Sequence, residues 1–268
     1  MILRLAAAAL ISATPAVPAL AGGGIADAAR LEVLDGGMTR RGTYLAALHL
    51  TLPEGWKTYW RAPGDAGIPP HFDWRGSRNL GDVAITWPAP EVFEQDGMRS
   101  IGYAQDLVLP IEITPGRADR PVRLRGEMEL GLCKDVCIPE TLTFDHRLDE
   151  TAGRHPAIAA AMAQRPHTAS EAGVESATCR LTPTAEGMRI EARIAMPSAG
   201  GQEYAVIEPG DPRLWASQTR TGRDGATLLA SGILVQSGGG AFALDRSRIR
   251  ITVLGSDRAV DILGCLPG

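Results

Sequence analysis

The sequence VRLRGEMEL, residues 122–130, alternates apolar and charged side chains with a period of two. This is the period of a β-strand, in which successive side chains point to opposite faces. One face would pack on a protein core and the other would meet water: Val122, Leu124, Met128 and Leu130 against Arg123, Arg125, Glu127 and Glu129. The pattern therefore predicts a half-buried strand.

Two cysteines follow this strand in GLCKDVCIPE, residues 131–140, and the alternation resumes in TLTFDHRL, residues 141–148. The two alternating runs predict an antiparallel pair of strands, joined by a loop that carries Cys133 and Cys137. If the register of the first strand continued, Cys133 would face outward, although Gly131 could break that register. The pair would then be accessible to another protein's thiolate, as thiol–disulfide exchange requires.

Many short alternating runs separated by Gly and Pro turns indicate β-sandwiches, and heptads, a βαβ rhythm and tandem repeats are absent from the sequence. A helix candidate at residues 157–164 ends at Arg165-Pro166. We predict an all-β protein with two β-sandwich domains, residues 22–150 and 173–268, joined by a short, partly helical linker at 151–172. Besides the first pair, strands are expected at residues 44–52, 188–194, 204–208, 226–235 and 248–254.

The N-terminus has the pattern of a targeting segment. A short basic start at Met1–Arg4 precedes an apolar, alanine-rich run to about Leu20, and Ala19-Leu20-Ala21 matches a cleavage signal. We predict a signal peptide of residues 1–21, cleaved near Ala21. No other stretch of about 18 apolar residues occurs, so no membrane span is expected in the mature chain. Export would place the cysteines where disulfides form and persist.

Composition and motifs exclude several functions. The 268 residues carry 27 Lys and Arg against 31 Asp and Glu, a balance that gives no reason to expect nucleic acid or an anionic membrane as partner. The sequence lacks G-x-S-x-G, H-E-x-x-H, P-loop and Rossmann fingerprints. Hydrolase, zinc protease and nucleotide chemistry therefore have no support.

The chain has 4 cysteines, which allow three pairings. In the chain-entropy model a loop of about five residues contributes about 2 kcal/mol, and one of about 87 residues contributes about 4.6 kcal/mol. A bridge between Cys133 and Cys137 would thus be a weak staple, and we favour the pairing of Cys133 with Cys137 and of Cys179 with Cys265, the latter as a structural disulfide. The roles open to the first pair are redox exchange, a structural bridge and a two-thiolate Cu(I) site. Zinc is less suited, because a closed zinc site needs four ligands.

The segment GWKTYWRAPGDAGIPP, residues 55–70, resembles the GWxxYWxxPGDAGxPP signature of DsbD-like periplasmic domains, which occur in the copper-sensitivity suppressor ScsB and its relatives. The resemblance covers about residues 30–150. The second half fits the longer ScsB-type periplasmic region without a sharp motif. Shorter motifs follow in the family's order: Trp87-Pro88-Ala89-Pro90, Gly102-Tyr103, Leu109-Pro110-Ile111-Glu112-Ile113, and Cys133 to Cys137-Ile138-Pro139-Glu140.

The resemblance implies an immunoglobulin-like fold and periplasmic thiol:disulfide exchange without a cofactor or metal. Cys133 and Cys137 would be the redox pair, with Cys137 attacking a partner's disulfide and Cys133 resolving the product. The implied partners are a membrane electron donor of the CcdA or DsbD-core type and a periplasmic thioredoxin-fold client. The donor would be a separate protein, because no membrane span is expected here. The alternative is a copper-handling or chaperone-like binding module, in which the pair binds Cu(I) or is only structural.

Three residues are candidates for a cap or support of the pair. By the resemblance, a mobile cap with an aromatic residue would lie at about residues 91–97, with Phe93 as the candidate, although a core position is the commoner role. Asp65 could accept a proton near the cysteines, or cap the turn in PGDAG. Tyr103, in the matched Gly102-Tyr103 motif, is the third.

The aromatic residues of the signature segment divide between two faces. Alternation places Trp56 and Trp60 on one face of a strand-like segment and Tyr59 on the other. Core packing is the first interpretation of all three, and an aromatic patch that docks a partner is the alternative.

Overall fold

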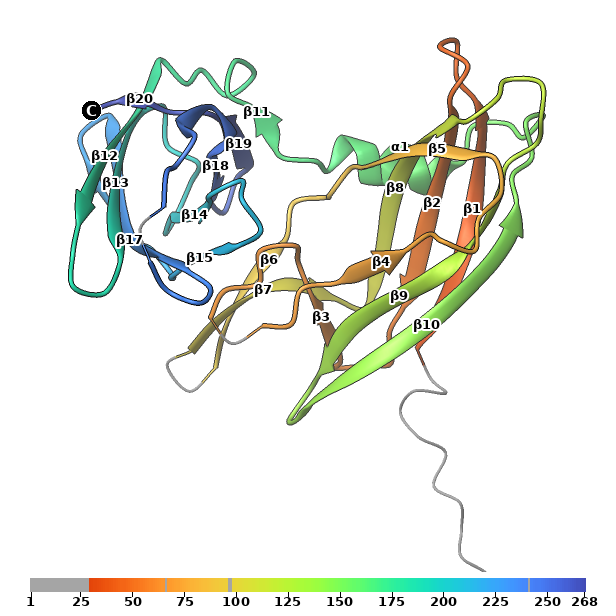
Figure 1. Cartoon of the computed structure of the whole chain (residues 1–268), viewed down its shortest axis with the longest axis horizontal. Helices are drawn as coiled ribbons and strands as arrows, with labels where there is room; N and C mark the ends of the chain where they lie inside the picture. The colour runs from red at the N-terminus through yellow and green to blue at the C-terminus, as the bar shows by residue number, and fades with distance from the viewer. Residues whose placement is uncertain (1–28, 66, 96–97, 241) are drawn as a thin grey trace, which may run out of the picture.

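The computed structural model describes residues 29–65, 67–95, 98–240 and 242–268. Two β-sandwiches lie side by side, with the N-terminal one on the right of Figure 1 and the C-terminal one on the left. The predicted fold class is confirmed: two immunoglobulin-like sandwiches joined by a short, partly helical connection. The predicted signal peptide, residues 1–21, lies outside the described residues. The exact limits of the two domains stay a prediction.

Two sheets build the N-terminal sandwich. The first has the order β1-β2-β8-β5, with β1 Arg30–Met38, β2 Tyr44–Thr51, β8 Asp106–Pro115 and β5 Leu80–Ile85. The second has the order β10-β9-β3-β7-β6, and β4 also pairs with β9. Its strands are β3 Lys57–Tyr59, β4 His71–Asp73, β6 Glu91–Gln95, β7 Met98–Ala104, β9 Arg123–Cys133 and β10 Cys137–Arg147.

The alternation of residues 122–130 determines which face of β9 meets the core. Its apolar side chains are buried with those of β2 and β8 from the other sheet, and its charged side chains are exposed. Burying one such apolar side chain stabilises the fold by about 1.5–3 kcal/mol. The inward side chains of β9 are Leu124, Met128, Leu130 and Leu132, all at most 2% exposed.

Helix α1, Pro156–Ala163, lies in the connection between the sandwiches, where the sequence predicted a helix. Pro156 starts it, since proline lacks the N–H that a first helical turn leaves unpaired. Ile158 and Ala161 are buried, and the helix packs beside β8. Strand β11, His167–Thr168, then pairs with β19, so the chain has already entered the C-terminal sandwich within the predicted linker.

The C-terminal sandwich repeats the two-sheet plan around its own apolar core. One sheet has the order β11-β19-β18-β14, with β14 Tyr204–Glu208, β18 Arg250–Leu254 and β19 Ala259–Leu263. The other has the order β15-β17-β13-β12-β20, and β16 also pairs with β17. Its strands are β12 Ser176–Pro183, β13 Met188–Ala195, β15 Leu214–Ala216, β16 Arg220–Asp224, β17 Thr227–Gln236 and β20 Leu266–Pro267; the 3-10 turn η2, Arg246–Arg248, precedes β18.

A disulfide between Cys179 and Cys265 closes this sandwich, as the favoured pairing expected. Cys179 on β12 is 0% exposed, and Cys265 directly before β20 is 7% exposed. Both belong to the apolar core. Among the described residues, none forms a helix with the length and hydrophobicity needed to cross a bilayer.

The sandwiches meet along a surface called here the joint: residues 61–65 and Arg99 on the N-terminal side, and residues 205–209 and 214–219 on the C-terminal side. Apolar contact adds to it, since Leu254 and Ala259 of the C-terminal sandwich pack with the N-terminal core. The joint also lines a partly open cavity of about 500 Å³. Hydrogen bonds also cross the joint, from Arg61 to Glu208 and from Gln218 to Asp65, and they contribute to the relative placement of the two sandwiches.

The two disulfides should differ in their effect on stability. Replacing Cys179 and Cys265 by serine should lower the free energy of unfolding by about 2–5 kcal/mol, because the bridge closes a long loop within a core. The same change at Cys133 and Cys137 should cost about 2 kcal/mol or less. Urea unfolding, followed by tryptophan fluorescence, measures both values. A larger loss of stability from replacing Cys133 and Cys137 than from replacing Cys179 and Cys265 would contradict the structural assignment of the Cys179–Cys265 bridge.

Candidate redox site

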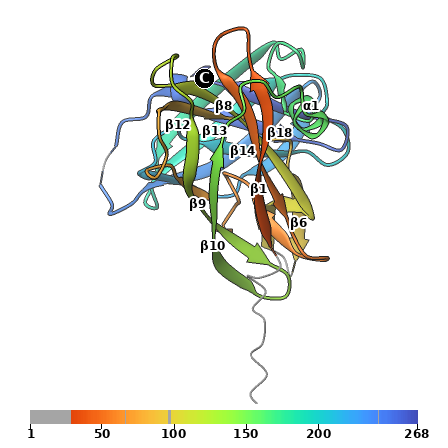
Figure 2. The ribbon, with the colours of Figure 1, turned by 90° about the vertical axis from the view of Figure 1, so that its right-hand side faces the viewer.

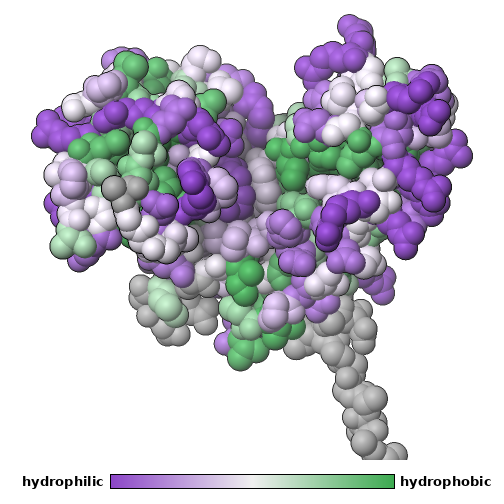
Figure 3. Space-filling model, in the orientation of Figure 1, coloured by the Kyte–Doolittle hydropathy of each residue, from purple (hydrophilic) through white to green (hydrophobic). Residues whose placement is uncertain are grey.

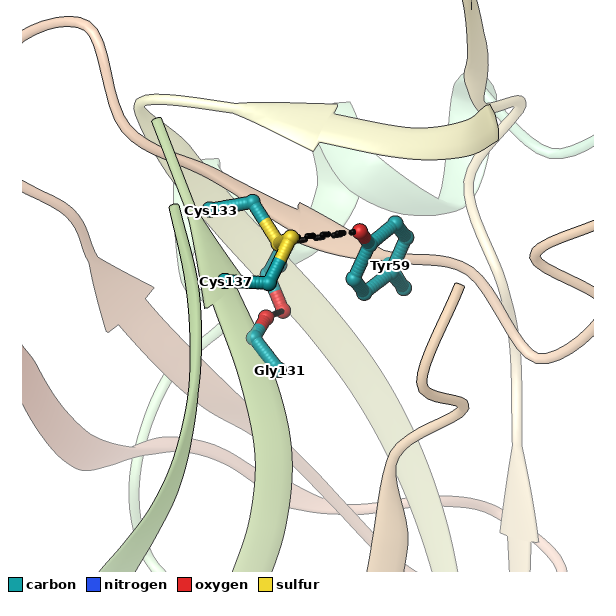
Figure 4. The surroundings of a disulfide bond; sticks show 5 residues. Tyr59, Gly131, Cys133 and Cys137 are labelled. Carbon is teal, nitrogen blue, oxygen red and sulfur yellow. Dashed lines mark hydrogen bonds between the residues drawn. A yellow bond between two sulfur atoms is a disulfide. The ribbon is translucent and has the colours of Figure 1, made fainter. Parts of the chain in front are cut away.

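The Cys133–Cys137 disulfide joins the two strands of one hairpin (Figure 4). Cys133 ends β9, Cys137 begins β10, and the two lie directly opposite each other, with Cα atoms 4.1 Å apart. The predicted antiparallel pair is confirmed, but the expectation that a loop carries the cysteines is wrong, because the strands continue up to both. Opposed residues of antiparallel strands have their Cβ atoms close together. The hairpin itself therefore holds the sulfurs near each other.

The two sulfurs differ in exposure. Cys133 is only 1% exposed, whereas Cys137 is exposed. Continuing the register of β9 places Leu132 on the core face and Cys133 on the opposite face. Leu132 does belong to the core cluster, and Cys133 does not. The expectation that Cys133 would be accessible there is wrong, because the neighbouring strand β3 and the side chain of Tyr59 cover it. Of the two cysteines, only Cys137 is exposed to solvent.

Tyr59, at the end of β3, holds its hydroxyl against both sulfurs. Its Oη lies 2.9 Å from Sγ of Cys133 and 3.2 Å from Sγ of Cys137. The hydroxyl is the donor, because a disulfide sulfur carries no hydrogen. Burial raises the pKa of Tyr59 above its ordinary value of 10.0, so the hydroxyl keeps its proton at neutral pH. A proton donor is therefore fixed at the reacting bond.

Glycine at two positions leaves room for the Tyr59 ring. Lys57 pairs with Cys133, so the register brings Tyr59 beside Gly131, and the Thr58 hydroxyl donates to the Gly131 carbonyl. A Cβ on Gly131 would lie 3.0 Å from two ring carbons of Tyr59. On another side of the ring, a Cβ on Gly67 would lie 2.9 Å from Tyr59 Cδ1. The ring is therefore held closely between Gly131 and Gly67.

Sequence analysis did not select Tyr59 as a site residue. The assignment of faces is confirmed, since Trp56 and Trp60 belong to the core cluster and Tyr59 does not. Tyr59 is buried, at 3% exposed, as the core interpretation expected, but its hydroxyl contacts the disulfide, which that interpretation did not foresee. The available signal was that Tyr59 points away from the core face that Trp56 and Trp60 share. Gly131, two residues before Cys133, offered the space for its ring. Recognising it required the pairing of β3 with β9, which local periodicity does not report.

Phe93, the candidate cap residue, lies on β6 and is partly buried. The Lys57 ammonium lies 5.0 Å from the centre of its ring, and Lys57 is the residue opposite Cys133. Phe93 is thus linked to the cysteine region through one lysine. Residues 96–97 of the expected cap lie outside that part. The cap role stays a prediction.

Asp65 and Tyr103, the other candidates, make contacts away from the sulfurs. The Asp65 carboxylate accepts a hydrogen bond from the main-chain N–H of Gln218 across the joint. This contact gives no support to its role as a base. Tyr103 is buried in the core and donates to the Pro88 carbonyl at 2.8 Å. Burial raises the pKa of Tyr103 far above its usual range, so it acts as a structural hydrogen-bond donor.

Charged residues lie beside the pair: Lys134 and Asp135 stand between the two cysteines, and Lys57 is opposite Cys133. The Lys134 ammonium, 3.5 Å from the Glu54 carbonyl, is held toward that main chain. Within residues 29–268, leaving out the masked positions 66, 96–97 and 241, no three His, Cys, Asp or Glu side chains are grouped to hold a metal ion.

An immunoglobulin-like sandwich whose hairpin carries a disulfide with one exposed sulfur defines a thiol:disulfide interchange module. Residues 34–148 match the family described as "Thiol:disulfide interchange protein DsbD, N-terminal". This part of the chain is therefore a DsbD/ScsB-type N-terminal domain. No curated protein matches the sequence significantly.

The solved structures extend the likeness of fold to both sandwiches. The crystal structure of the N-terminal periplasmic domain of ScsB from Proteus mirabilis matches with a TM-score of 0.69 and 21% sequence identity. The match covers 90% of this chain and 95% of that chain. The C-terminal sandwich, in which sequence analysis found no sharp motif, is thus part of the same architecture.

Replacing Tyr59 by phenylalanine should reduce the reactivity of the reduced pair. A hydrogen bond to a thiolate contributes about 1.5 kcal/mol or more, so its loss should lower the thiolate fraction about tenfold at neutral pH. A more basic thiolate is about threefold more nucleophilic, so the alkylation rate at pH 7 should fall about threefold. The rate of iodoacetamide alkylation from pH 5 to 10 measures this. An unchanged pH midpoint would contradict the role of Tyr59.

Proposed function

We propose that this protein is a periplasmic thiol:disulfide exchange protein of the protein-disulfide reductase type. It accepts electrons from a membrane reductase of the CcdA or DsbD-core type and passes them to a thioredoxin-fold client through Cys133 and Cys137. The observation that carries the proposal is the asymmetric disulfide, with Cys137 exposed, Cys133 buried and a hydroxyl at both sulfurs. The match to the DsbD N-terminal family supports it.

The exposure of Cys137 and the burial of Cys133 support an order of two steps. In the reduced protein the Cys137 thiolate attacks one sulfur of the client disulfide, forms a mixed disulfide and releases the client's other sulfur as a thiolate. The Cys133 thiolate then attacks Sγ of Cys137, which restores the internal disulfide and releases the client with both thiols reduced. Two electrons pass to the client, and the membrane donor returns two electrons to the Cys133–Cys137 bond. Cys133 needs no access for this second step, since its target is within the same hairpin.

Tyr59 serves the attacking and the resolving sulfur alike. Its hydroxyl is within 3.2 Å of both, so a thiolate on either cysteine can accept its hydrogen bond. A hydrogen bond to an ionised acceptor is about twice as strong as one to a neutral acceptor. Tyr59 therefore stabilises the thiolate form more than the disulfide form, and raises the fraction of the reduced pair that is ready to react.

The surroundings of Cys137 suit a protein client. In Figures 1 and 2 the turn of the β9–β10 hairpin lies at the lower end of the N-terminal sandwich, beyond the neighbouring strands. Figure 3 shows apolar surface at this end, and Val136 beside Cys137 is 63% exposed. A client with an apolar rim around its own disulfide would bury this surface on docking. The periplasmic placement is supported by the leader pattern and by the ScsB likeness.

Single-cysteine variants test the order of attack. Reduced Cys133→Ser protein should form a stable mixed disulfide with an oxidised thioredoxin-fold protein, because Cys137 can attack and nothing resolves the product. Cys137→Ser should trap at least tenfold less, because Cys133 is buried. Non-reducing gels and intact mass measure the yield, with Cys179→Ser/Cys265→Ser protein as a control that retains the redox pair. Equal trapping by both single variants would contradict the assignment.

The reduction potential separates exchange from the alternatives. Equilibration with glutathione or dithiothreitol buffers should give a value between about −270 and −180 mV, the range of redox-active thiol proteins. A value below about −300 mV would make the pair a structural bridge and overturn the proposal. Stoichiometric Cu(I) binding that Cys133→Ser abolishes, without any mixed disulfide, would favour the binding module instead.

A further inference from the structure

The C-terminal sandwich carries no exposed cysteine, yet it contacts residues 61–65, which follow Tyr59 closely in the chain and meet it again through Gly67. We propose that it is a positioning element for the redox pair: Glu208 and Gln218 hold residues 61–65, and this segment holds the Tyr59 hydroxyl against the sulfurs. The inference rests on the proposed exchange function and gives the second sandwich a part in it. Glu208 and Gln218 are positioning residues, since neither is in contact with the sulfurs.

The first contact is an ion pair across the joint. Arg61 Nε lies 3.0 Å from Glu208 Oε1, and Arg61 Nη2 lies 2.9 Å from Glu208 Oε2, which is a two-pronged arrangement. The side chains are 16% and 23% exposed, so water screens the pair only in part. The Arg61 guanidinium also stacks 4.1 Å from the centre of the Trp60 ring, which is fully buried. Glu208 thus fixes the residues that directly follow Tyr59.

The second contact is made by Gln218 at two points. Its main-chain N–H donates to Asp65 at 3.1 Å, and its side-chain amide donates to the Arg99 carbonyl at 2.7 Å. Gly64 lies between these groups with a φ of 85°, a backbone conformation that favours glycine. A Cβ there would lie 3.0 Å from the Arg99 carbonyl and 3.2 Å from the Gln218 amide. The segment is therefore confined between Gln218 and strand β7.

The confined segment reaches Tyr59 through Pro63 and Gly67. The Pro63 carbonyl accepts a hydrogen bond from the Ile101 N–H at 3.0 Å, which ties the segment to β7. A Cβ on Gly67 would come within 2.2 Å of Pro63 Cβ and 2.9 Å of Tyr59 Cδ1. Gly67 therefore lies close against both Pro63 and the Tyr59 ring, and close-packed groups transmit small displacements. A shift at the joint would therefore change how the Tyr59 hydroxyl meets the sulfurs.

The cavity at the joint makes its polar contacts important. It lies between residues 61–65 and residues 205–209 and 214–219, with a volume of about 500 Å³. Where apolar packing is interrupted in this way, the Arg61–Glu208 pair and the Gln218 contacts hold the segment. Loss of one of them would let residues 61–65 relax toward the cavity, because space is available on that side.

The test compares Glu208→Ala in two backgrounds, in the full two-sandwich protein. With Tyr59 present, Glu208→Ala should lower the thiolate fraction of the reduced pair at pH 7 threefold to tenfold, measured by the pH dependence of alkylation. The dithiothreitol equilibrium should move toward the disulfide. In a Tyr59→Phe background the same substitution should change both readouts less than twofold, because no hydroxyl remains to be positioned. Glu208→Gln, which keeps an acceptor oxygen for Arg61, should restore most of the wild-type behaviour.

Glu203→Ala is the matched control. It removes the acidic partner of Arg223, in an Arg–Glu pair with side chains 22% and 5% exposed that lies within the C-terminal sandwich. It should leave the thiolate fraction within twofold of wild type. An equal shift in this control, an equal effect of Glu208→Ala with and without Tyr59, or no shift in folded Glu208→Ala protein would each overturn the proposal.

A milder variant keeps the proposal testable if Glu208→Ala protein does not fold. Gln218→Ala removes only the side-chain bond to Arg99 and keeps the main-chain N–H bond to Asp65. It should shift the alkylation midpoint in the same direction as Glu208→Ala, again only when Tyr59 is present, and an unshifted midpoint would count against the proposal. Both readouts are defined without any client, so a failure of the mixed-disulfide experiment and a failure of this coupling are distinguishable.

Discussion

The antiparallel ladder between β9 and β10 is the constraint on which the rest of the site depends. Its register, from Cys133 opposite Cys137 to Arg123 opposite Arg147, turns one face of the hairpin to the core and the other to solvent, except at the cysteine end, where Tyr59 covers it. A slip of one residue would reverse the two faces and put a cysteine into the core. Because the ladder already holds the ends of the disulfide together, breaking the S–S bond frees little chain entropy. The hairpin can therefore keep its shape in both redox states, which a repeating exchange cycle requires.

The two disulfides of this chain show that environment, more than bond type, sets their function. Exchange needs a thiolate to approach one sulfur of the bond from outside. Cys179 and Cys265 lie in the core of the C-terminal sandwich, so no thiolate can reach them without unfolding. Cys137 is exposed at the end of a hairpin, while its partner is covered. The same kind of covalent bond therefore closes a core in one sandwich, and in the other it lies where the proposed exchange needs it.

Sequence patterns predicted which face a strand presents, and structure was needed to show what covers that face. The alternation in residues 122–130 gave the core face of β9, and cysteine spacing gave the favoured pairing. The burial of Cys133 could not be predicted in this way, because its cover comes from Tyr59, 74 residues away in the chain. The same holds for Asp65, whose partner Gln218 lies 153 residues further on. Long-range register decides such contacts, and local periodicity carries no information about it.

The placement of a tyrosine hydroxyl at both sulfurs lowers the reducing power of the dithiol and raises its rate of attack. Because the hydroxyl stabilises a thiolate more than a neutral disulfide, it makes the reduced form easier to reach and so a weaker reductant. In return, more of the pair is ionised at neutral pH, and the thiolate is the species that attacks. A protein that relays electrons between two partners benefits from this balance, since it must accept them from one disulfide exchange and release them in the next. Gly131 and Gly67, on two sides of the Tyr59 ring, fix the position of its hydroxyl and so the strength of that hydrogen bond. On our proposal, the second sandwich holds the Gly67 side through residues 61–65.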